Sequence, residues 1–237
     1  AAKRSGANTI TLVNPYFAYS RQDKVDHIRS SIGSKVMATM LESVGLDKII
    51  CLDLHNSAIQ GFFNKAEVIH LNGSKIFFNY INSKKLTDIT IVSPDQGGMA
   101  RATNFAKMFD NCQLSVINKK RIKPNEIHSM ELVGNVKDRN VIIIDDLCDT
   151  GGTLKKAAEL LKENGAKSIY SIATHGVLSG NALENIETSV LDEFIVSNSI
   201  SSNKESSKIV TISCASLIAN CIIRLDTKRS IDELNKV

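Results

Sequence analysis

The residues best suited to chemistry lie in one short stretch, VIIIDDLCDTGGT, at positions 141–153. A run of branched apolar residues, typical of a buried strand, ends in Asp145 and Asp146 and is followed by a Gly-Gly loop flanked by threonines. Loop amides and the N-terminus of the next helix would present N–H donors and partial positive charge to a phosphate group. The two carboxylates could accept hydrogen bonds from ribose hydroxyls. The stretch therefore predicts a site for a phosphorylated sugar.

Nucleophilic catalysis is the alternative use of this loop. Cys148 lies inside it, but no histidine is near it in the sequence to activate the thiol. Sugar-phosphate binding is the simpler interpretation. The residues predicted to bind the sugar phosphate are Asp145, Asp146, Asp149, Thr150, Gly151, Gly152 and Thr153.

The composition is that of an ordinary globular chain of 237 residues, long enough for one large or two small domains. Hydrophobic residues make up 43%, and no apolar run is long enough to cross a bilayer, so we expect no membrane role. The net charge is only +4, without a basic cluster interleaved with aromatics, so nucleic acid is not an expected partner. The five cysteines show no CxxC pair, and the N-terminus lacks the apolar core of a signal peptide. We expect reduced thiols and a cytoplasmic location.

Short β-type runs alternate with amphipathic helical patterns, which predicts an α/β fold with a largely parallel sheet covered by helices. Strands are expected at 10–16, 48–55, 87–95, 112–120, 168–176, 193–200 and 208–214. Helices are expected at 33–45, 74–83, 99–109 and 153–164, and from about Ala215 onward. The polar stretch 121–131 is expected to interrupt this order as a loop.

A series of motifs runs through the chain in order: PYFAYSRQDK, DLHNSAIQGFF, IVSPDQGG, INKKR, LVGNVKDRNVIIIDDLCDTGGT and THGVLSG. These motifs resemble the ribose-phosphate pyrophosphokinase family, and the resemblance covers the chain from Ala1 to about Ile223. It implies two type I phosphoribosyltransferase-like domains with mainly parallel sheets, the first incomplete. Residues 1–69 would be the remnant of the N-terminal domain, and residues 70–237 the C-terminal domain with the ribose-phosphate loop.

The resemblance implies transfer of the pyrophosphoryl group of Mg-ATP to the C1 hydroxyl of ribose 5-phosphate, giving phosphoribosyl pyrophosphate (PRPP) and AMP. Such a transfer depends on in-line positioning and on neutralising phosphate charge. Lys119 and Arg121 in INKKR match the family's catalytic Lys and Arg on a mobile loop over the triphosphate. The polar RIKPNEI stretch is expected to order when substrate binds.

Sites for ATP and Mg²⁺ are implied in the same way. Arg21 and Gln22 match the family's ATP-contacting pair, with Asp23 in support, because a guanidinium can stack on adenine or grip phosphate oxygens. His55 and Asp95 match the positions that bind Mg²⁺. Mg²⁺ prefers oxygen ligands, so a core histidine is the alternative for His55.

Some segments depart from the family pattern or carry no assigned role. The family has an N-terminal stretch that reaches a neighbouring subunit's ATP site, and the chain is expected to lack it and to be a weak catalyst alone. Asn64, Lys65 and Ala66 stand where the family has an aspartate and a proline, so a second metal site there is not expected. His175 and Ser179 in THGVLSG match a family segment but are not assigned to catalysis.

Two other functions stay open at this point. One is a catalytically weak homologue that regulates active subunits, and the other is a phosphoribosyltransferase that consumes PRPP. The resemblance also implies a homo-oligomer whose ATP site is shared between subunits.

Overall fold

The computed structural model describes residues 1–123, 126–202 and 206–235, and the side chains of residues 120–129 also lie outside the described part. The chain forms two compact units. The first contains Ala1–Gly73 and residues 216–235, and the second contains Ser74–Ala215. This division falls close to the boundary expected after residue 69, but it groups the last helices with the first unit. The two-domain assignment itself stays a proposal.

The first unit is built on a three-stranded parallel sheet in the order β1 (Thr11–Val13), β2 (Lys48–Leu52), β3 (Glu67–Leu71). Helix α1 (Gly33–Ser43) and the 3-10 helix η1 (Ser57–Phe62) belong to this unit, as do α6 (Ala215–Asp226) and α7 (Asp232–Asn235) at the C-terminal end. A buried cluster fills its core, formed by Phe17, Leu46, Ile49, Cys51, Leu54, Ile59 and Ala66.

The C-terminal end of the chain is tied to β3. Asn235 Nδ2 donates to the carbonyl oxygen of His70 at 2.9 Å, and Asn235 Oδ1 accepts from the backbone N–H of Asn72 at 3.0 Å. These two bonds explain why the last helices belong to the first unit although more than a hundred residues of the second unit precede them.

Helix α1 packs with only part of the apolar face that its sequence predicts. Met37 and Leu41 pack against the core of the first unit. Val36, Met40 and Val44 are instead 49%, 57% and 74% exposed. The helical spacing was therefore right, but the stripe is wider than the contact surface that the small sheet offers.

The second unit contains a seven-stranded sheet in the order β10-β9-β8-β7-β4-β5-β6. All neighbouring strands are parallel except β5 and β6, which are antiparallel. The strands are β4 (Ile89–Ser93), β5 (Gln113–Lys123), β6 (Glu126–Val133), β7 (Asn140–Cys148), β8 (Ser168–Gly176), β9 (Glu193–Ser197) and β10 (Ile209–Ile212). The helices are α2 (Ser74–Ser83), α3 (Met99–Ala106), α4 (Gly152–Glu163) and α5 (Ala182–Glu187).

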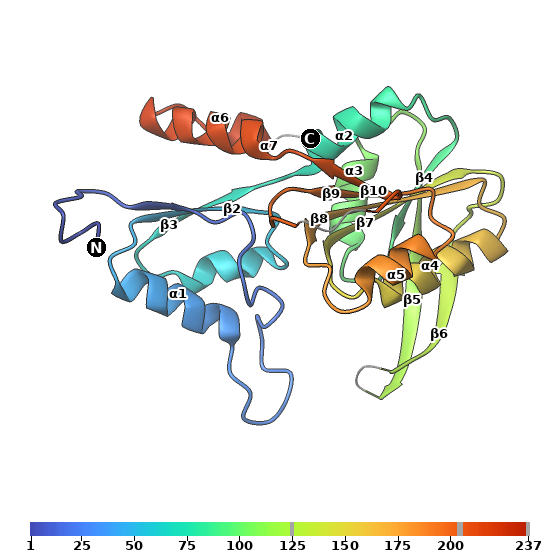
Figure 1. The fold of residues 1–237 in the computed structure, drawn as a ribbon, viewed down its shortest axis with the longest axis horizontal. Coiled ribbons are helices and arrows are strands. Elements are labelled where there is room, and N and C mark those ends of the chain that lie inside the picture. Colours follow the sequence, from blue (N-terminus) through green and yellow to red (C-terminus); the bar gives the residue numbers. More distant parts are fainter. Residues whose placement is uncertain (124–125, 203–205, 236–237) are drawn as a thin grey trace. The chain divides into compact units, whose positions relative to one another are not determined.

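Strand β7 lies in the middle of this sheet and is buried on both faces. Val141 and Ile143 belong to one cluster with residues of α4 and α5, while Ile142 and Ile144 belong to another with residues of α2 and α3. Figure 1 shows these two helix pairs on opposite sides of the strands. Alternating side chains of one strand thus serve two cores, which explains its continuous apolar sequence.

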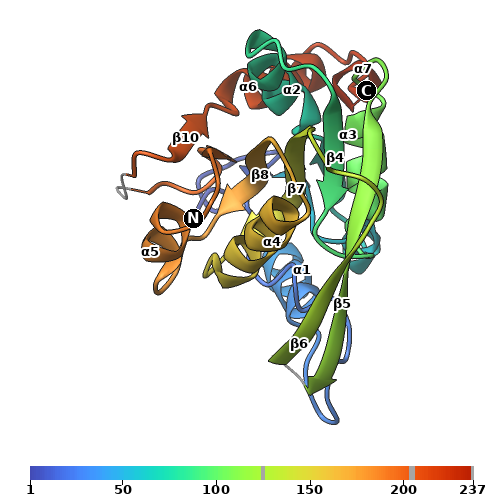
Figure 2. The same cartoon turned by 90° about the vertical axis from the view of Figure 1, so that its right-hand side faces the viewer.

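The expected loop at 121–131 is the main correction to the predicted elements. Residues up to Lys123 continue β5, and β6 begins at Glu126 and pairs with it; residues 124–125 lie outside the described part. Figure 2 shows the two strands running together beyond α4. The sequence is polar because this pair forms the end of the sheet, where backbone pairing needs no apolar side chains.

Some elements were not expected from the sequence at all. These are β3, η1 and α5, each of six residues or fewer. Within the described residues, no helix has the length and apolar character needed to span a bilayer.

Candidate functional site

The predicted carboxylates emerge at the carboxyl end of β7. Asp145 and Asp146 follow four buried apolar residues, and the backbone N–H of Asp146 donates to Asp145 Oδ1 at 2.9 Å. Their exposures differ: the side chain of Asp145 is 39% exposed and that of Asp146 only 5%. Only Asp145 therefore presents a substantial carboxylate surface to solvent.

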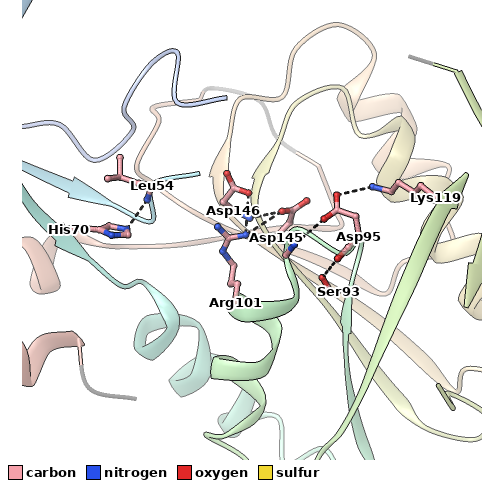
Figure 3. A network of polar contacts seen from close by, with 9 residues as sticks. Leu54, His70, Ser93, Asp95, Arg101, Lys119, Asp145 and Asp146 are labelled. Carbon is pink, nitrogen blue, oxygen red and sulfur yellow. Dashed lines mark hydrogen bonds and ion pairs between the residues drawn. The ribbon is translucent and has the colours of Figure 1, made fainter. Parts of the chain in front are cut away.

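An arginine that the sequence did not single out pairs with both carboxylates. Arg101 Nη1, from α3, lies 3.3 Å from Asp146 Oδ1 and 3.6 Å from Asp145 Oδ1 (Figure 3). Although part of the Asp145 side chain reaches solvent, its place in the packed end of the sheet and the neighbouring Asp146 charge raise its pKa to about 7, and Arg101 opposes that rise. Among the described contacts, Arg101 is the cation that pairs with both carboxylates.

A second polar pair lies at the same edge of the sheet. Asp95 follows β4, and its Oδ2 atom lies 3.4 Å from Lys119 Nζ on β5. Parallel pairing aligns Val92 with Ile143, so the residues just after β4 and the carboxylates of β7 emerge at one end of the sheet (Figure 3). The structure thus brings together Asp95, Lys119 and the two carboxylates, as the shared strand edge requires.

The loop around Asp95 is fixed by local hydrogen bonds. Ser93 Oγ donates to the carbonyl oxygen of Asp95 at 2.6 Å, and Asp95 Oδ1 accepts from the N–H of Gly98 at 3.0 Å. A Cβ at Gly98 would lie 2.8 Å from Ser93 Oγ, which is too close. A side chain at this position would therefore displace the Ser93 hydroxyl, so glycine suits this turn.

The predicted sugar-phosphate loop connects β7 to α4. Gly151 adopts φ 72°, in the left-handed region, and forms the N-cap of α4. No side-chain hydrogen bond caps this helix, and its first turn carries no acidic residue. Thr150 and Thr153 are exposed beside it. The first amides of α4 are thus available for an anion.

The segment after β8 holds this loop in place. Ser179 Oγ donates to Asp149 Oδ1, and the N–H of Ser179 donates to the Asp149 carbonyl at 3.0 Å. Asn185 Nδ2 donates to the Thr150 carbonyl at 2.9 Å. Ser179, which the sequence analysis left without a role, therefore supports the loop, and Asn185 was missed.

Other residues near the loop have structural roles. Burial raises the pKa of the Cys148 thiol to about 12, and the charges of Asp145 and Asp149 add to the rise. A thiol that stays protonated is a poor nucleophile, so the structure disfavours the alternative of Cys148 catalysis. His175 is 3% exposed and shares a 2.8 Å hydrogen bond with Ser199 Oγ, which fits a buried hydrogen-bonding histidine.

The predicted ATP residues lie in the first unit. Arg21 and Gln22 are exposed, and the backbone carbonyl of Gln22 accepts from the Ser34 hydroxyl at 2.9 Å, next to the start of α1. Asp23 Oδ2 accepts from Asn56 Nδ2 at 2.7 Å. These contacts join the RQDK and DLHN segments within one unit, although the two are far apart in the sequence.

His55, the first predicted Mg²⁺ ligand, is exposed, so the core-histidine alternative is wrong. The residue before it is held by a second histidine, because the N–H of Leu54 donates to His70 Nε2 at 2.9 Å (Figure 3). His55 belongs to the first unit and Asp95 to the second, so their pairing on one ion stays a prediction. Among the described residues, no group of three histidine, cysteine or acidic side chains could hold a metal.

Two further expectations from the sequence concern Arg121 and the turn near Asn64. The backbone of Arg121 lies in β5 and not in a loop, and its side chain is outside the described part. Near Asn64, where a second metal site was not expected, Glu42 accepts from the N–H groups of Lys65 and Ala66 at 2.6 and 2.8 Å. The Glu42 carboxylate is thus engaged with the backbone of that turn.

Comparison with known proteins gives the class of the chain. The model of the phosphoribosyl synthetase-associated domain matches residues 106–236, and that of the N-terminal domain of ribose phosphate pyrophosphokinase matches residues 1–45. Fold, strand-end carboxylates and these matches together define a phosphoribosyl synthetase of the α/β class.

Relatives are similar in sequence to this chain along nearly its whole length. The ribose-phosphate pyrophosphokinase of Helicobacter pylori is 46% identical over 99% of this chain and 73% of its own length. That of Bacillus caldolyticus is 43% identical over 99% of this chain and 74% of its own. The crystal structure of phosphoribosylpyrophosphate synthetase from Mycobacterium smegmatis superimposes with a TM-score of 0.88 at 36% identity, covering 95% of this chain and 74% of that one.

The chain belongs to the ribose-phosphate pyrophosphokinase family. The predicted α/β fold with mainly parallel sheets, the family and the enzyme class are thereby confirmed. The individual site residues remain predictions, supported by the geometry described above.

The Asp145 carboxylate generates a prediction about stability. Between its ordinary pKa of 3.8 and about 7, the unfolded chain releases this proton while the folded chain retains it, so ionisation weakens the fold as pH rises. We expect Asp145→Asn to raise the melting temperature by an amount that grows from about pH 4 to pH 7 and then levels off. Melting curves across that range, with the exposed Asp110→Asn as control, measure it. A gain that is constant with pH would contradict the raised pKa.

Proposed function

We propose that the chain transfers the pyrophosphoryl group of Mg-ATP to the C1 hydroxyl of ribose 5-phosphate, giving PRPP and AMP for nucleotide biosynthesis. The observation that carries this proposal is the grouping of Lys119, Asp95 and the Asp145–Asp146 pair at one end of a sheet that also carries the uncapped loop before α4. A lysine and a carboxylate for a charged nucleotide thus lie at the same edge as a cradle for a sugar phosphate.

In this proposal the loop and carboxylates bind the acceptor sugar. The amides at the start of α4 receive the 5-phosphate, and exposed Asp145 accepts hydrogen bonds from ribose hydroxyls. Ser179 and Asn185 hold the loop so that little order has to be gained on binding.

Lys119 would stabilise negative charge on the transferred group, and Arg121 is proposed for the same role from the matching motif. Lys119 is 9% exposed and held against Asp95, so its ammonium group is positioned before substrate arrives. Arg21 and Gln22, with Asp23 in support, are proposed to contact ATP from the first unit.

Magnesium fits the donor set of the site. Asp95 supplies a carboxylate that is 45% exposed, so its oxygens are accessible to a hydrated cation. Mg²⁺ usually takes one or two protein carboxylates and completes its shell with water and phosphate oxygens, so a large protein cluster is not required. Bound there, Mg²⁺ would neutralise charge on the triphosphate. His55 is proposed as a Mg²⁺ ligand from the matching motif alone.

Assembly and location complete the proposal. We place the protein in the cytoplasm, as expected for an enzyme whose cysteines show no disulfide framework. A homo-oligomer with an ATP site shared between subunits is supported by the family resemblance. A monodisperse monomer with full activity in light scattering and kinetic assays would contradict it.

The deciding assay measures AMP formation from ATP. We expect a signal that requires both ribose 5-phosphate and Mg²⁺. Consumption of PRPP with a nucleobase would instead favour a phosphoribosyltransferase. Sugar-phosphate binding without either reaction would favour a regulatory homologue.

Replacing Asp149 by alanine should abolish most ribose 5-phosphate binding, because it removes the acceptor that anchors the loop to Ser179. Saturating ligand should stabilise the wild-type protein by about 2.7 kcal/mol at a hundredfold excess over Kd. Thermal-shift titration measures this gain, and Glu163→Ala at the exposed end of α4 is the control. Equal stabilisation of the Asp149→Ala variant would move the sugar phosphate elsewhere.

Replacing Lys119 by alanine should lower kcat far more than it raises KM for ATP, because the ammonium is proposed to act on the transition state. A loss of about a hundredfold to a thousandfold, ~2.7–4 kcal/mol, corresponds to removal of one preorganised donor. Steady-state kinetics with the exposed Lys107→Ala as control provide the test. A rise in KM alone would reduce Lys119 to a ground-state phosphate contact.

A further inference from the structure

Arg101 is the one residue among the described contacts that joins both carboxylates of β7 to a cation. It lies on α3, in the crossover that follows the Asp95 loop, and is 20% exposed. Its Nη1 atom donates to Asp146 Oδ1 at 3.3 Å and forms an ion pair with Asp145 Oδ1 at 3.6 Å (Figure 3). No sequence motif or matching family segment assigned it a role.

The two carboxylates divide their contacts according to exposure. Asp146, 5% exposed, faces Arg101 and has little surface left for a ligand. Asp145, 39% exposed, has the weaker contact with Arg101 and the more accessible oxygens. Asp146 is therefore suited to anchoring the arginine, and Asp145 to meeting the sugar.

We propose that Arg101 is a positioning residue for ribose 5-phosphate, which acts through Asp146 to keep the Asp145 carboxylate directed toward the sugar hydroxyls. The proposal rests on the function proposed above. Without the guanidinium, two adjacent carboxylates repel each other at close range, and the less buried one gains a proton or turns away. A protonated or displaced Asp145 loses acceptor capacity for the hydroxyls, so sugar affinity falls.

The chain offers a matched control in Arg139. This arginine is also partly buried and donates twice, to Thr90 Oγ1 at 2.6 Å and to the Ile89 carbonyl at 2.9 Å. It is bonded at the amino end of β4, whereas Arg101 acts at the carboxyl end of β7. Loss of Arg139 should therefore affect the fold without affecting the sugar.

The test measures ribose 5-phosphate affinity by calorimetry, KM and kcat by AMP formation, and melting temperature. Arg101→Gln should weaken affinity and raise KM for ribose 5-phosphate by about tenfold to a hundredfold, the range of hydrogen bonds to charged groups, with a smaller change in kcat. Arg101→Lys should lie between Arg101→Gln and wild type, because it restores the charge but not the planar donor group. Arg139→Gln should lower the melting temperature and leave the affinity near that of wild type.

A double-mutant cycle with Asp146→Asn tests the route of the effect. If Arg101 acts through Asp146, the double variant Arg101→Gln with Asp146→Asn should lose less affinity than the product of the losses measured for the two single variants. The double variant also removes the buried charge of Asp146, so it reports on binding even if Arg101→Gln folds poorly.

The outcomes separate the inference from the proposed function. The role of Arg101 would be overturned, and the function left intact, if the wild-type protein binds ribose 5-phosphate and Arg101→Gln keeps the same affinity and KM. The same holds if the effects of the two single variants simply multiply in the double variant. A wild-type protein that neither binds ribose 5-phosphate nor forms AMP from it would overturn both.

Discussion

The burial of β7 on both faces is the constraint on which the second unit depends. Its apolar residues alternate between two cores, so a polar group can emerge only where the strand ends. Because β4, β7 and β8 are parallel neighbours, all of their ends meet at one edge. The carboxylates of the site therefore lie at that edge, whereas polar side chains farther back along the strands, such as Thr90 and Ser171, are small and buried.

The same concentration makes the site electrostatically unfavourable when no ligand is bound. Adjacent carboxylates at the end of β7 raise the pKa of Asp145, and Arg101 compensates only in part. Such perturbed groups are expected where a ligand or a reaction supplies the missing interactions, which favours a functional interpretation of the pair.

Sequence reasoning predicted the features that depend on local pattern. Apolar runs gave most strands of the second unit, and the Gly-Gly loop after two carboxylates gave the sugar-phosphate cradle. Sequence reasoning missed β6 because the pairing at this edge of the sheet involves polar residues. It missed Arg101 and Asn185 because their hydrogen bonds join residues 45 and 35 positions apart in the sequence. Such contacts depend on how the connections between strands bring distant residues to the same edge of the sheet, and the local spacing of residues does not encode this.

The start of α4 illustrates how support and function are divided. A side-chain cap at this helix would add about 1 kcal/mol of stability, but it would occupy the amides that an anion needs. Gly151 leaves them without such a cap, and the loop is instead fixed from outside by Ser179 and Asn185. External bracing gives the loop its shape while keeping its donors directed outward. The fold thus supports the loop from the segment after β8 and leaves the start of α4 without a side-chain cap, which suits a phosphate site.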